Sequence, residues 1–319
     1  MNKISKFMLF CVLLVISLSG CVQDKKYQVS EVGMDTVVQL TIYDKNAAQS
    51  ADKALAQMRR LDGLLNAYNP QSEISKINDF AGQAVQVSPD TLAVVNRALE
   101  YARKTNGAFD PTIGTVSRLW AIGKKGEFVP SNEQLQTALN LVDYTQVAVD
   151  PVAQTVKLNK PGMILDLGGV AKGYILETML QTLRECGVKS ALVNGGGDVL
   201  ILGKRADGKP WRIGVQDPRK PDGMLRAINM DKYDQASTSG DYQRYFIKDG
   251  IRYHHIFDPR SGYPVKGLIA ATVIGKQGSV DIPSNVLMVM GEARALEFVS
   301  AYPELKVILV NEQGMVIQN

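Results

Sequence analysis

Hydrophobic and polar positions follow two different periods along this chain, and segments of the two kinds are mixed. Residues 34–43, MDTVVQLTIY, are rich in β-branched side chains that roughly alternate with polar ones, which predicts a strand. Apolar residues then recur every three or four positions between residues 46 and 68, which predicts an amphipathic helix. These apolar positions are Leu55, Met58, Leu61 and Leu65.

Capping signals locate the starts of further helices. Ser88-Pro89 supplies an N-cap and a proline at the first position of a helix that runs to about Thr105. Ser131 and Gln134 have the spacing of a capping box. Helices are also expected over residues 170–184, 283–290 and 292–301. Short strands are expected at 147–157, 161–166, 191–202, 211–216, 227–230, 244–247, 253–257, 268–274, 307–310 and 315–318.

The order of these elements favours an α+β fold, because strands and helices do not alternate in the strict manner of a doubly wound sheet. The chain has 319 residues, which allows one or two domains. It contains no internal repeat, no low-complexity segment and no linker rich in proline, glycine or serine. We therefore expect one folded region over residues 31–319.

The N-terminus has the features of a bacterial lipoprotein leader. Lys3 and Lys6 precede an apolar run over residues 7–16, which is too short for a spanning helix of about 20 residues. The following Leu18-Ser19-Gly20-Cys21 resembles a lipobox, in which Cys21 becomes the lipidated first residue. An ordinary signal peptide or an N-terminal anchor is the alternative, and in each case we expect an exported protein.

Export sets where the protein works and what stabilises it. Residues 1–20 would be removed as a signal peptide, and Cys21 would be anchored by its acyl chains to the inner or outer membrane, facing the periplasm. Residues 21–30 would form a polar tether. Cys186 is then the only cysteine of the folded part, so no intramolecular disulfide is expected. Removal of the two leader lysines lowers the formal charge from +4 to +2, and no basic run indicates a nucleic-acid partner.

A glycine turn between a strand and a helix is the first candidate for a ligand site. Residues 163–177, MILDLGGVAKGYILE, predict a strand ending at Asp166, a turn at Gly168 and Gly169, and then a helix. Free N–H groups and the dipole at a helix start can receive a phosphate, and glycine lets it approach closely. Lys172 in the first helical turn would pair with such a phosphate. A tight turn without a ligand is the alternative.

Two further turns carry side chains suited to a flat ring with hydroxyl groups. Phe109 offers a ring face beside Asp110, whose carboxylate can accept hydrogen bonds from ribose hydroxyls. Tyr68 ends a helix just before Asn69-Pro70, so its ring would project as a stacking surface. The alternatives are an Asx turn at Asp110 and an ordinary core or surface position for Tyr68.

Asp281, Ser284 and Asn285 place three oxygen donors just before an apolar helix. Mg²⁺ takes oxygen ligands of this kind and shares them with the phosphates of a substrate. A helix cap supplied by Asp281 or Ser284 explains the same residues without a metal. Together with the glycine turns, which include Gly195–Gly197, these residues favour a ligand with a diphosphate and a flat ring, such as FAD.

The only two histidines of the chain, His254 and His255, are adjacent in the segment YHHIFDP. Alternation along a strand sends them to opposite faces, so one of them can face a given site. Adjacent histidines do not suit a metal-binding pair on one strand, and cysteine ligands are absent, so the sequence does not favour a zinc site.

The order of these motifs resembles that of one family, the ApbE-type FAD:protein FMN transferases. The similar segments run from about residue 31 to residue 319. They are GMDTVVQLTIYD, AYNPQSEISKIN, TNGAFDPTIG, DLGGVAKGY, LVNGGGD, STSGDYQRYF, YHHIFDPRSGYPV and the segment around Asp281. The resemblance implies an α+β fold of two lobes, with FAD in the cleft between them.

The resemblance also implies a reaction. Such enzymes cleave the diphosphate of FAD with Mg²⁺ and place FMN on a threonine of a partner protein through a phosphoester, releasing AMP. Typical partners are subunits of the Na⁺-translocating NADH:quinone reductase and of the related Rnf electron-transport complex. The alternatives are an FAD-binding lipoprotein and an FAD pyrophosphatase that releases FMN and AMP.

Residue by residue, the resemblance implies an FAD site, a metal site and a base. The FAD site would contain Met34, Tyr68, Ala108, Phe109, Asp110, Asp166, Lys172 and Phe257. Metal ligands would come from the Gly169 carbonyl and from Asp281, with Ser284 and Asn285 nearby. The family usually has threonine where Asn285 stands, although an asparagine carbonyl can also bind Mg²⁺. His255 aligns with the family's histidine and would be a base or an orienting group, with a purely structural role as the alternative.

Overall fold

The computed structural model describes residues 26–124, 126–278 and 283–319. The predicted signal peptide, the lipidation site Cys21 and the predicted metal ligand Asp281 lie outside these residues. Within the described ranges, no helix combines the length and the apolar character needed to cross a membrane.

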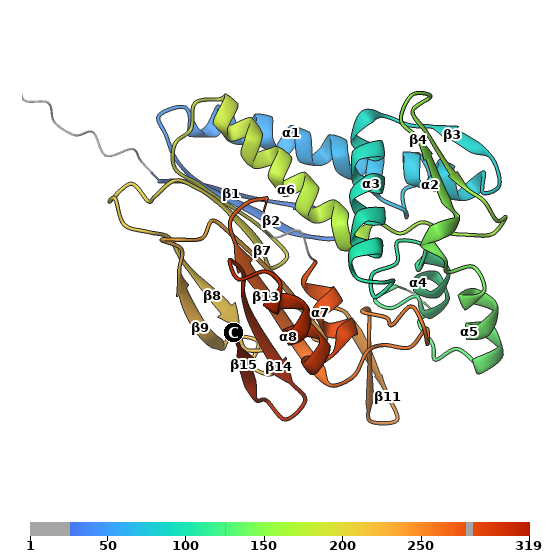
Figure 1. The fold of residues 1–319 in the computed structure, drawn as a ribbon. Coiled ribbons are helices and arrows are strands. Elements are labelled where there is room, and N and C mark those ends of the chain that lie inside the picture. The colour runs from blue at the N-terminus through green and yellow to red at the C-terminus, as the bar shows by residue number, and fades with distance from the viewer. Residues whose placement is uncertain (1–25, 125, 279–282) are drawn as a thin grey trace, which may run out of the picture.

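An eight-stranded antiparallel sheet forms the first lobe of the molecule (Figure 1). Its strand order is β1-β2-β6-β7-β10-β13-β14-β15, so the two ends of the described chain lie at opposite edges. The strands are β1 (Lys26–Gly33), β2 (Thr36–Tyr43), β6 (Ala191–Gly195), β7 (Asp198–Leu202), β10 (Gln235–Gly240), β13 (Leu268–Gly275), β14 (Lys306–Asn311) and β15 (Val316–Gln318). Strand β13, LIAATVIG, is buried along its whole length, as expected for a strand covered on both faces.

Part of the predicted tether is wrong, because β1 already begins at Lys26. The strand pairs with β2 along its whole length, from Lys26 opposite Tyr43 to Gly33 opposite Thr36. Tyr27 and Val29 alternate with polar neighbours and pack against the core, which is the period of a half-buried strand. The polar composition of residues 22–30 concealed this alternation.

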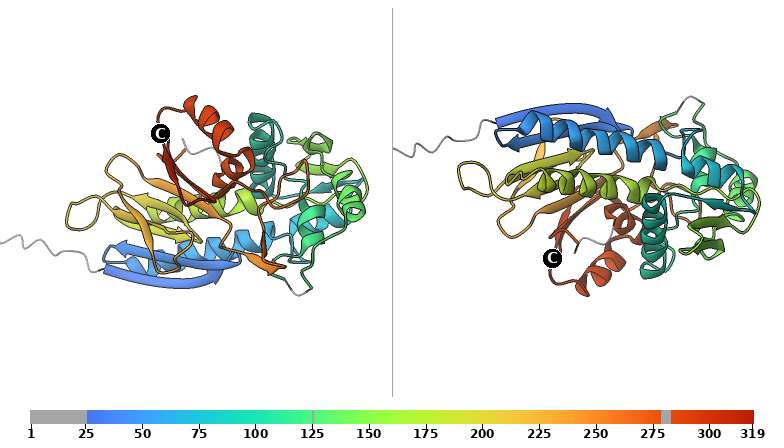
Figure 2. Two further views of the ribbon diagram at one scale, coloured as in Figure 1. Left: turned by 90° about the horizontal axis from the view of Figure 1, so that it is seen from below. Right: turned by 90° about the horizontal axis from the view of Figure 1, so that it is seen from above.

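Helices α1 (Ala47–Leu65) and α6 (Gly168–Glu185) lie side by side over one face of the sheet (Figure 2). Helices α7 (Ser284–Met290) and α8 (Glu292–Ser300) pack beside β13 and β14. Leu40 of β2, Leu176 of α6 and Leu287 of α7 belong to one continuous core, so α6 and α7 pack on the same face of the sheet.

The opposite face is covered in part by a second, two-stranded sheet of β8 (Arg212–Gln216) and β9 (Met224–Asn229). Trp211 and Val215 pack there against Ile201 of the large sheet. This small sheet therefore covers the core cluster on that face of the large sheet.

The second lobe contains four helices, a short 3₁₀ helix and a three-stranded sheet of order β3-β5-β4. Its elements are α2 (Glu73–Asp79), β3 (Ala84–Gln86), α3 (Pro89–Lys104), α4 (Gly114–Trp120), α5 (Asn132–Leu139), η1 (Tyr144–Gln146), β4 (Val147–Asp150) and β5 (Thr155–Leu158). The predicted caps are confirmed: Ser88 accepts a hydrogen bond from the N–H of Thr91, and Ser131 with Gln134 forms a capping box.

The strand predicted to end at Asp166 is absent, and the segment makes a single bridge, between Ile164 and Ile113. The side chain of Asn78 takes the place of a neighbouring strand. Its Oδ1 accepts from the N–H of Leu165 at 2.7 Å and its Nδ2 donates to the Leu165 carbonyl at 3.0 Å. A buried amide satisfies the backbone here, which periodicity along one segment does not show.

A hairpin of β11 (Tyr245–Lys248) and β12 (Ile251–His254) projects from the body (Figure 1). Asp249 and Gly250 form its turn with φ of 51° and 74°, as a two-residue hairpin requires. Strand β12 ends at His254, earlier than predicted, because the ring Nδ1 of His254 accepts from the N–H of Ile256 and turns the chain.

Candidate functional site

A cleft of about 850 Å³ lies between the two lobes, within the range of roughly 300–1,000 Å³ common for cofactor sites. Its walls come from the β1–β2 turn, the end of α1, the start of α6, the β6–β7 turn, strand β10 and the start of α7. Every predicted site residue within the described ranges lines it. These residues are Met34, Tyr68, Ala108, Phe109, Asp110, Asp166, Gly169, Lys172, His255, Phe257, Ser284 and Asn285.

The β1–β2 turn brings Met34 into the cleft in an unusual backbone conformation. Met34 and Asp35 both have φ of 56°, in the left-handed region that favours glycine and asparagine. The N–H of Met34 donates to Asp62 on α1 at 3.2 Å, which holds the turn in place. Strained residues of this kind concentrate at ligand sites, where the surrounding structure maintains them.

Charged groups meet at the mouth of the cleft around Asp35. Lys124 lies 3.2 Å and Arg244 3.9 Å from the Asp35 carboxylate. The ammonium of Lys124 also lies 4.6 Å from the centre of the Tyr68 ring, whose residue is 46% exposed. The tyrosine therefore projects as predicted, with a cation beside one ring face.

The carboxylate of Asp110 is occupied by its own surroundings. One oxygen accepts from the N–H and the hydroxyl of Thr112 at 2.8 and 2.6 Å, and the other accepts from the N–H of Tyr144 at 3.1 Å. Burial raises the pKa of Asp110, and these hydrogen bonds oppose that rise. The geometry is that of the Asx turn, which was the alternative to a ribose contact. We name Asp110 with its partners Thr112 and Tyr144 the Asp110 corner.

Phe109 is buried rather than presented as an open ring face. It meets Tyr101 edge to face at 6.1 Å and borders Gly169 in the first turn of α6. A Cβ atom on Gly169 would lie 2.8 Å from the Phe109 ring, so only glycine fits there. The aromatic ring thus shapes the start of α6 as well as the cleft.

The start of α6 carries charged side chains that are already paired. Asp166 accepts from the N–H of Gly168 at 2.9 Å. Lys172 lies 3.3 Å from the carboxylate of Asp198 at the start of β7. Lys172 is therefore held between the helix and the large sheet, facing the cleft, rather than free at the helix end.

Hydroxyl groups connect β10 to α7 at the floor of the cleft. Ser284 is buried, and its oxygen lies 3.0 Å from that of Ser237 and 2.8 Å from that of Ser239. Ser237 also donates to Asp198 at 2.6 Å. Pro283 is the N-cap residue of α7, so the alternative in which Ser284 caps this helix is wrong, and its other candidate, Asp281, lies outside the described residues.

Asn285 lies beside Ser284 and has a different character. Its Oδ1 is buried and accepts no hydrogen bond from any described residue. Its Nδ2 lies 3.2 Å from the position of a Cβ on Gly169, so two of the predicted metal-site residues are neighbours. Buried polar atoms without a partner are uncommon and often await an ion or a ligand. We name Asn285 with Gly169 the Asn285 corner.

The donor set at the Asn285 corner suits a hard cation. The Asn285 Oδ1, which has no partner among the described residues, a serine hydroxyl and the Gly169 carbonyl are all oxygen donors, which Mg²⁺ prefers. Among the residues that the structure covers, no three His, Cys, Asp or Glu side chains form a metal cluster. The residues present therefore fit Mg²⁺ rather than a metal that needs histidine or cysteine ligands.

The two histidines point in different directions, as predicted. His254 is buried, and its Nε2 lies 2.9 Å from the carbonyl of Val265. His255 lines the cleft, and its Nδ1 lies 3.3 Å from the carbonyl of Arg244. A carbonyl only accepts, so Nδ1 carries the proton and Nε2 remains an acceptor. Burial, helped by the charge of Arg244, lowers the pKa of His255 to about 3, so its ring is neutral at physiological pH.

Phe257 follows on the same wall of the cleft. Its ring is largely buried and stacks on that of Trp120 at 6.0 Å. Phe257 also bridges to Pro264 across the returning loop. Packing from the second lobe therefore fixes a ring that borders the cleft.

Sequence reasoning missed four residues that shape the cleft. Asp198 positions Lys172 and Ser237, and Asp35 gathers the cations at the mouth. Asp198 directly follows the glycines of LVNGGGD, and Ser237 opens STSGDYQRYF, so both lie within segments that resemble the family. Asp35 and Arg244 also lie within such segments, GMDTVVQLTIYD and STSGDYQRYF, but no local pattern shows that their side chains meet, because they come from distant turns.

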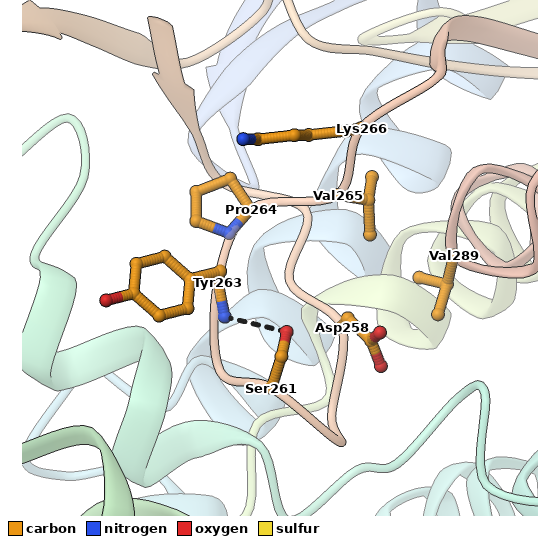
Figure 3. A pocket seen from close by; sticks show the side chains of 7 residues that line it. All are labelled: Asp258, Ser261, Tyr263, Pro264, Val265, Lys266 and Val289. Atoms are coloured by element: carbon orange, nitrogen blue, oxygen red, sulfur yellow. Dashed lines mark hydrogen bonds between the residues drawn. The ribbon is translucent and has the colours of Figure 1, made fainter. Parts of the chain in front are cut away.

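A smaller hollow of about 490 Å³ lies beside the cleft (Figure 3). It is lined by Asp258, Ser261, Tyr263, Pro264, Val265, Lys266 and Val289. The Asp258 carboxylate is bound by the Arg260 guanidinium through two contacts of 2.9 Å, which neutralises it. Val289 borders both spaces, so the hollow is a side chamber rather than a separate charged site.

Comparisons with known proteins agree with this geometry. The sequence model described as the ApbE family matches residues 34–309. The FAD:protein FMN transferase of Treponema pallidum (strain Nichols) is 30% identical, with 95% of this chain and 89% of that protein covered. The protein of the same name from Klebsiella pneumoniae (strain 342) is 31% identical, with 92% of both covered.

Solved structures show the same fold. The crystal structure of the ApbE protein from Thermotoga maritima has a TM-score of 0.86 at 33% identity, covering 92% of this chain and 97% of that one. The apo form of the Pseudomonas stutzeri flavinyl transferase ApbE has a TM-score of 0.80 at 27% identity, covering 93% of this chain and 94% of that one. The two-lobed α+β fold predicted from the motifs is therefore confirmed.

Proposed function

This chain belongs to the ApbE family, and on that premise we propose that it transfers FMN from FAD to a threonine hydroxyl of an acceptor protein, releasing AMP. The observation that carries the proposal is the gathering of all twelve described motif residues on one cleft between the lobes. Relatives named FAD:protein FMN transferase at about 30% identity support the transferase class.

The walls of the cleft suit the parts of FAD. Tyr68 projects at the mouth, where its ring can stack on a flat isoalloxazine or adenine ring. Lys172 and the N-terminal turn of α6 face the cleft and suit the negative diphosphate. Asp110 acts on FAD through shape, because its carboxylate holds the loop that carries Phe109.

Mg²⁺ fits the Asn285 corner, where Asn285, Ser284 and the Gly169 carbonyl would hold it together with Asp281. When bound, the ion would supply positive charge against the diphosphate. The orphan Oδ1 of Asn285 supports this assignment, because a cation satisfies an acceptor that the described protein groups do not. Ser284 is kept in position by its hydrogen bonds to Ser237 and Ser239.

His255 is the proposed base. Its Nε2 takes the proton of the threonine hydroxyl while the hydroxyl oxygen forms a bond to the FMN phosphorus. The bond from that phosphorus to the bridging oxygen breaks, and AMP leaves with the oxygen. The hydrogen bond from Nδ1 to the Arg244 carbonyl holds the tautomer that this proton transfer needs. The lowered pKa keeps the ring unprotonated and makes it a weak base, so positioning contributes more than basicity.

The proposed acceptors are flavin-carrying subunits of the Na⁺-translocating NADH:quinone reductase or of Rnf-type complexes. The direct test incubates the protein with FAD, Mg²⁺ and the soluble acceptor domain of such a subunit, and measures flavin fluorescence of the acceptor in a denaturing gel. A labelled acceptor supports transfer. FMN and AMP without labelling would indicate a pyrophosphatase, and unchanged FAD would indicate a binding protein.

A His255→Ala variant tests the base. General-base catalysis contributes roughly 10²–10⁴-fold, so the transfer rate should fall by about 100-fold or more while FAD binding persists. A His255→Gln variant retains a neutral polar side chain and separates loss of the base from loss of packing. Transfer at the normal rate by His255→Ala would remove His255 from the chemistry.

Export and lipid anchoring are part of the same proposal. Cys21 would carry acyl chains after removal of residues 1–20, which would hold the cleft near membrane-bound acceptors in the periplasm. Labelling of growing cells with radioactive palmitate tests this, since a Cys21→Ala variant should lose the label. Palmitate on the variant would contradict the lipidation site.

A further inference from the structure

The β11–β12 hairpin forms the continuation of the cleft wall that carries His255. Arg244 precedes β11 and His255 follows β12, and both line the cleft. The N–H of His255 donates to the Arg244 carbonyl at 3.2 Å, so the hairpin ladder extends to the proposed base. Any chain lying along this hairpin is therefore led to the site of transfer.

One edge of the hairpin is open along β11. In a two-residue hairpin, the pair Lys248 and Ile251 next to the turn exchanges hydrogen bonds, and alternate pairs follow. The N–H and C=O groups of Tyr245 and Ile247 consequently point away from β12. No described residue pairs with these groups, and β11 has no second strand neighbour in the described structure.

The hairpin also exposes apolar side chains to solvent, where they contribute little to its stability. Tyr245 is 40%, Ile247 61% and Ile251 48% exposed. The opposite ring pair, Phe246 and Tyr253, stacks at 5.2 Å and packs on Trp120, so the hairpin is held on the body while its edge stays open. Open edges with apolar side chains invite strand addition, and proteins usually protect them.

Charge indicates the character of the occupant. Lys248 beside the turn has no ion-pair partner among the residues that the structure places. Arg244 lies 3.9 Å from Asp35 and Arg252 lies 4.0 Å from Asp241, and the Arg252 guanidinium also covers the Tyr245 ring at 3.8 Å. Against these three cations the hairpin offers one acid, Asp249. The edge therefore favours a segment that carries acidic as well as apolar side chains.

We propose that the β11 edge is the docking site of the acceptor protein, which adds an extended segment with acidic and apolar side chains as a third strand. This inference rests on the proposed function, because it supplies the route by which a threonine reaches His255. A strand advances about 3.3 Å per residue, so a residue three positions beyond the partner of Ile247 lies beside Arg244 at the cleft. Main-chain hydrogen bonds give affinity, and Tyr245 and Ile247 on β11 give side-chain contacts.

An Ile247→Pro variant tests the edge. The Ile247 N–H points outward, so proline removes the donor needed by an added strand without removing a hydrogen bond of the hairpin. We expect the KM for the acceptor domain to rise about tenfold or more, with FAD affinity unchanged within about twofold. An Ile247→Asp variant repeats the test without the backbone change, and Val152→Asp, at an exposed apolar residue in the β4–β5 turn, is the matched control.

Hydrogen exchange gives a readout that does not depend on turnover. In the full-length protein, the amides of Tyr245 and Ile247 should become protected when the acceptor domain is added, and the KM should rise with salt. A wild-type protein that labels the acceptor without this protection, together with normal labelling by both Ile247 variants, would overturn the docking site alone. A wild-type protein that neither binds nor labels the acceptor overturns the proposed function, and the docking site with it.

Discussion

The Asp110 corner and the Asn285 corner line the same cleft. Each contains a buried side-chain oxygen, but the two oxygens differ in whether the protein satisfies them. Asp110 presents a side-chain oxygen from the turn before α4, and Asn285 presents one from the first turn of α7. The Asp110 carboxylate accepts three hydrogen bonds from Thr112 and Tyr144, so it is satisfied by the protein alone. The Oδ1 of Asn285 is buried and accepts none from the described residues.

The difference teaches how to separate a wall from a ligand group. Burial removes water from both oxygens, and the folded chain compensates only one of them. Asp110 therefore belongs to the stability of the second lobe, whereas Asn285 carries a cost that a bound cation would offset. Substitutions at the two corners should move different observables.

The largest effect is expected for Asn285→Ala. Loss of an outer-shell partner of a metal ligand already costs about 10–100-fold in metal affinity or activity, so loss of a direct oxygen ligand should lower transfer at limiting Mg²⁺ by about 100-fold. The free energy of unfolding without metal should stay the same or rise, because an unsatisfied buried acceptor is removed. Initial rates of acceptor labelling against Mg²⁺ concentration, with urea unfolding in chelator, measure both quantities. Asn285→Thr places a hydroxyl oxygen at this position and should retain activity. A normal transfer rate for Asn285→Ala would contradict the different roles of the two corners.

Asp110→Ala should show the reverse pattern. It leaves the buried N–H groups of Thr112 and Tyr144 without an acceptor, so the free energy of unfolding should fall by about 3 kcal/mol. Urea denaturation followed by circular dichroism measures this loss. Asp110→Asn keeps one acceptor oxygen and should lose less. Unchanged stability together with lost FAD binding would move Asp110 to the ligand side of the comparison.

The smallest effect concerns pH and the two histidines. Burial lowers the pKa of His255 from its usual 6.5 to about 3, and also lowers that of His254. Below pH 6.5 the unfolded chain binds protons that the folded chain does not, so stability falls as the pH falls, by about 1–2 kcal/mol for His255 at pH 5. Thermal unfolding should show a smaller decrease in Tm between pH 7 and pH 5 for His255→Gln than for the wild-type protein. Protonation of His255 should not reduce the transfer rate in this window. A wild-type transfer rate that halves near pH 6.5 would indicate that His255 titrates at its usual pKa, and would contradict the lowered pKa.

Local chemistry predicted much of the fold. The Ser88 and Ser131 caps depend on neighbours within a few residues, and both are confirmed. The strand predicted before Asp166 failed because its partner is the side chain of Asn78, which lies 87 positions away along the chain from Leu165. The start of β1 at Lys26 was not predicted, because residues 22–30 are mostly polar and only Tyr27 and Val29 show the alternation of a strand.

The site was predictable where motifs are contiguous and unpredictable where it depends on pairing. A glycine turn indicated Gly169, and a set of oxygen donors before an apolar helix indicated Ser284 and Asn285, and all three line one cleft. No local pattern shows that the Asp110 carboxylate accepts its hydrogen bonds from Thr112 and Tyr144. A carboxylate in a turn has the same sequence signature whether its partner is a ribose or the next loop.

The buried Trp120 can serve as an intrinsic fluorescence probe of the cleft and of the β11–β12 hairpin. The indole has no exposed surface, lies against Phe257 of the cleft wall at 6.0 Å, and lies against Tyr253 of the docking hairpin at 5.3 Å. The second tryptophan of the chain, Trp211, sits in a different core cluster and can be replaced to leave one emitter. Intrinsic fluorescence of such a single-tryptophan protein would register flavin entry through energy transfer and acceptor arrival through a spectral shift, so both events can be timed in one cuvette without any added dye.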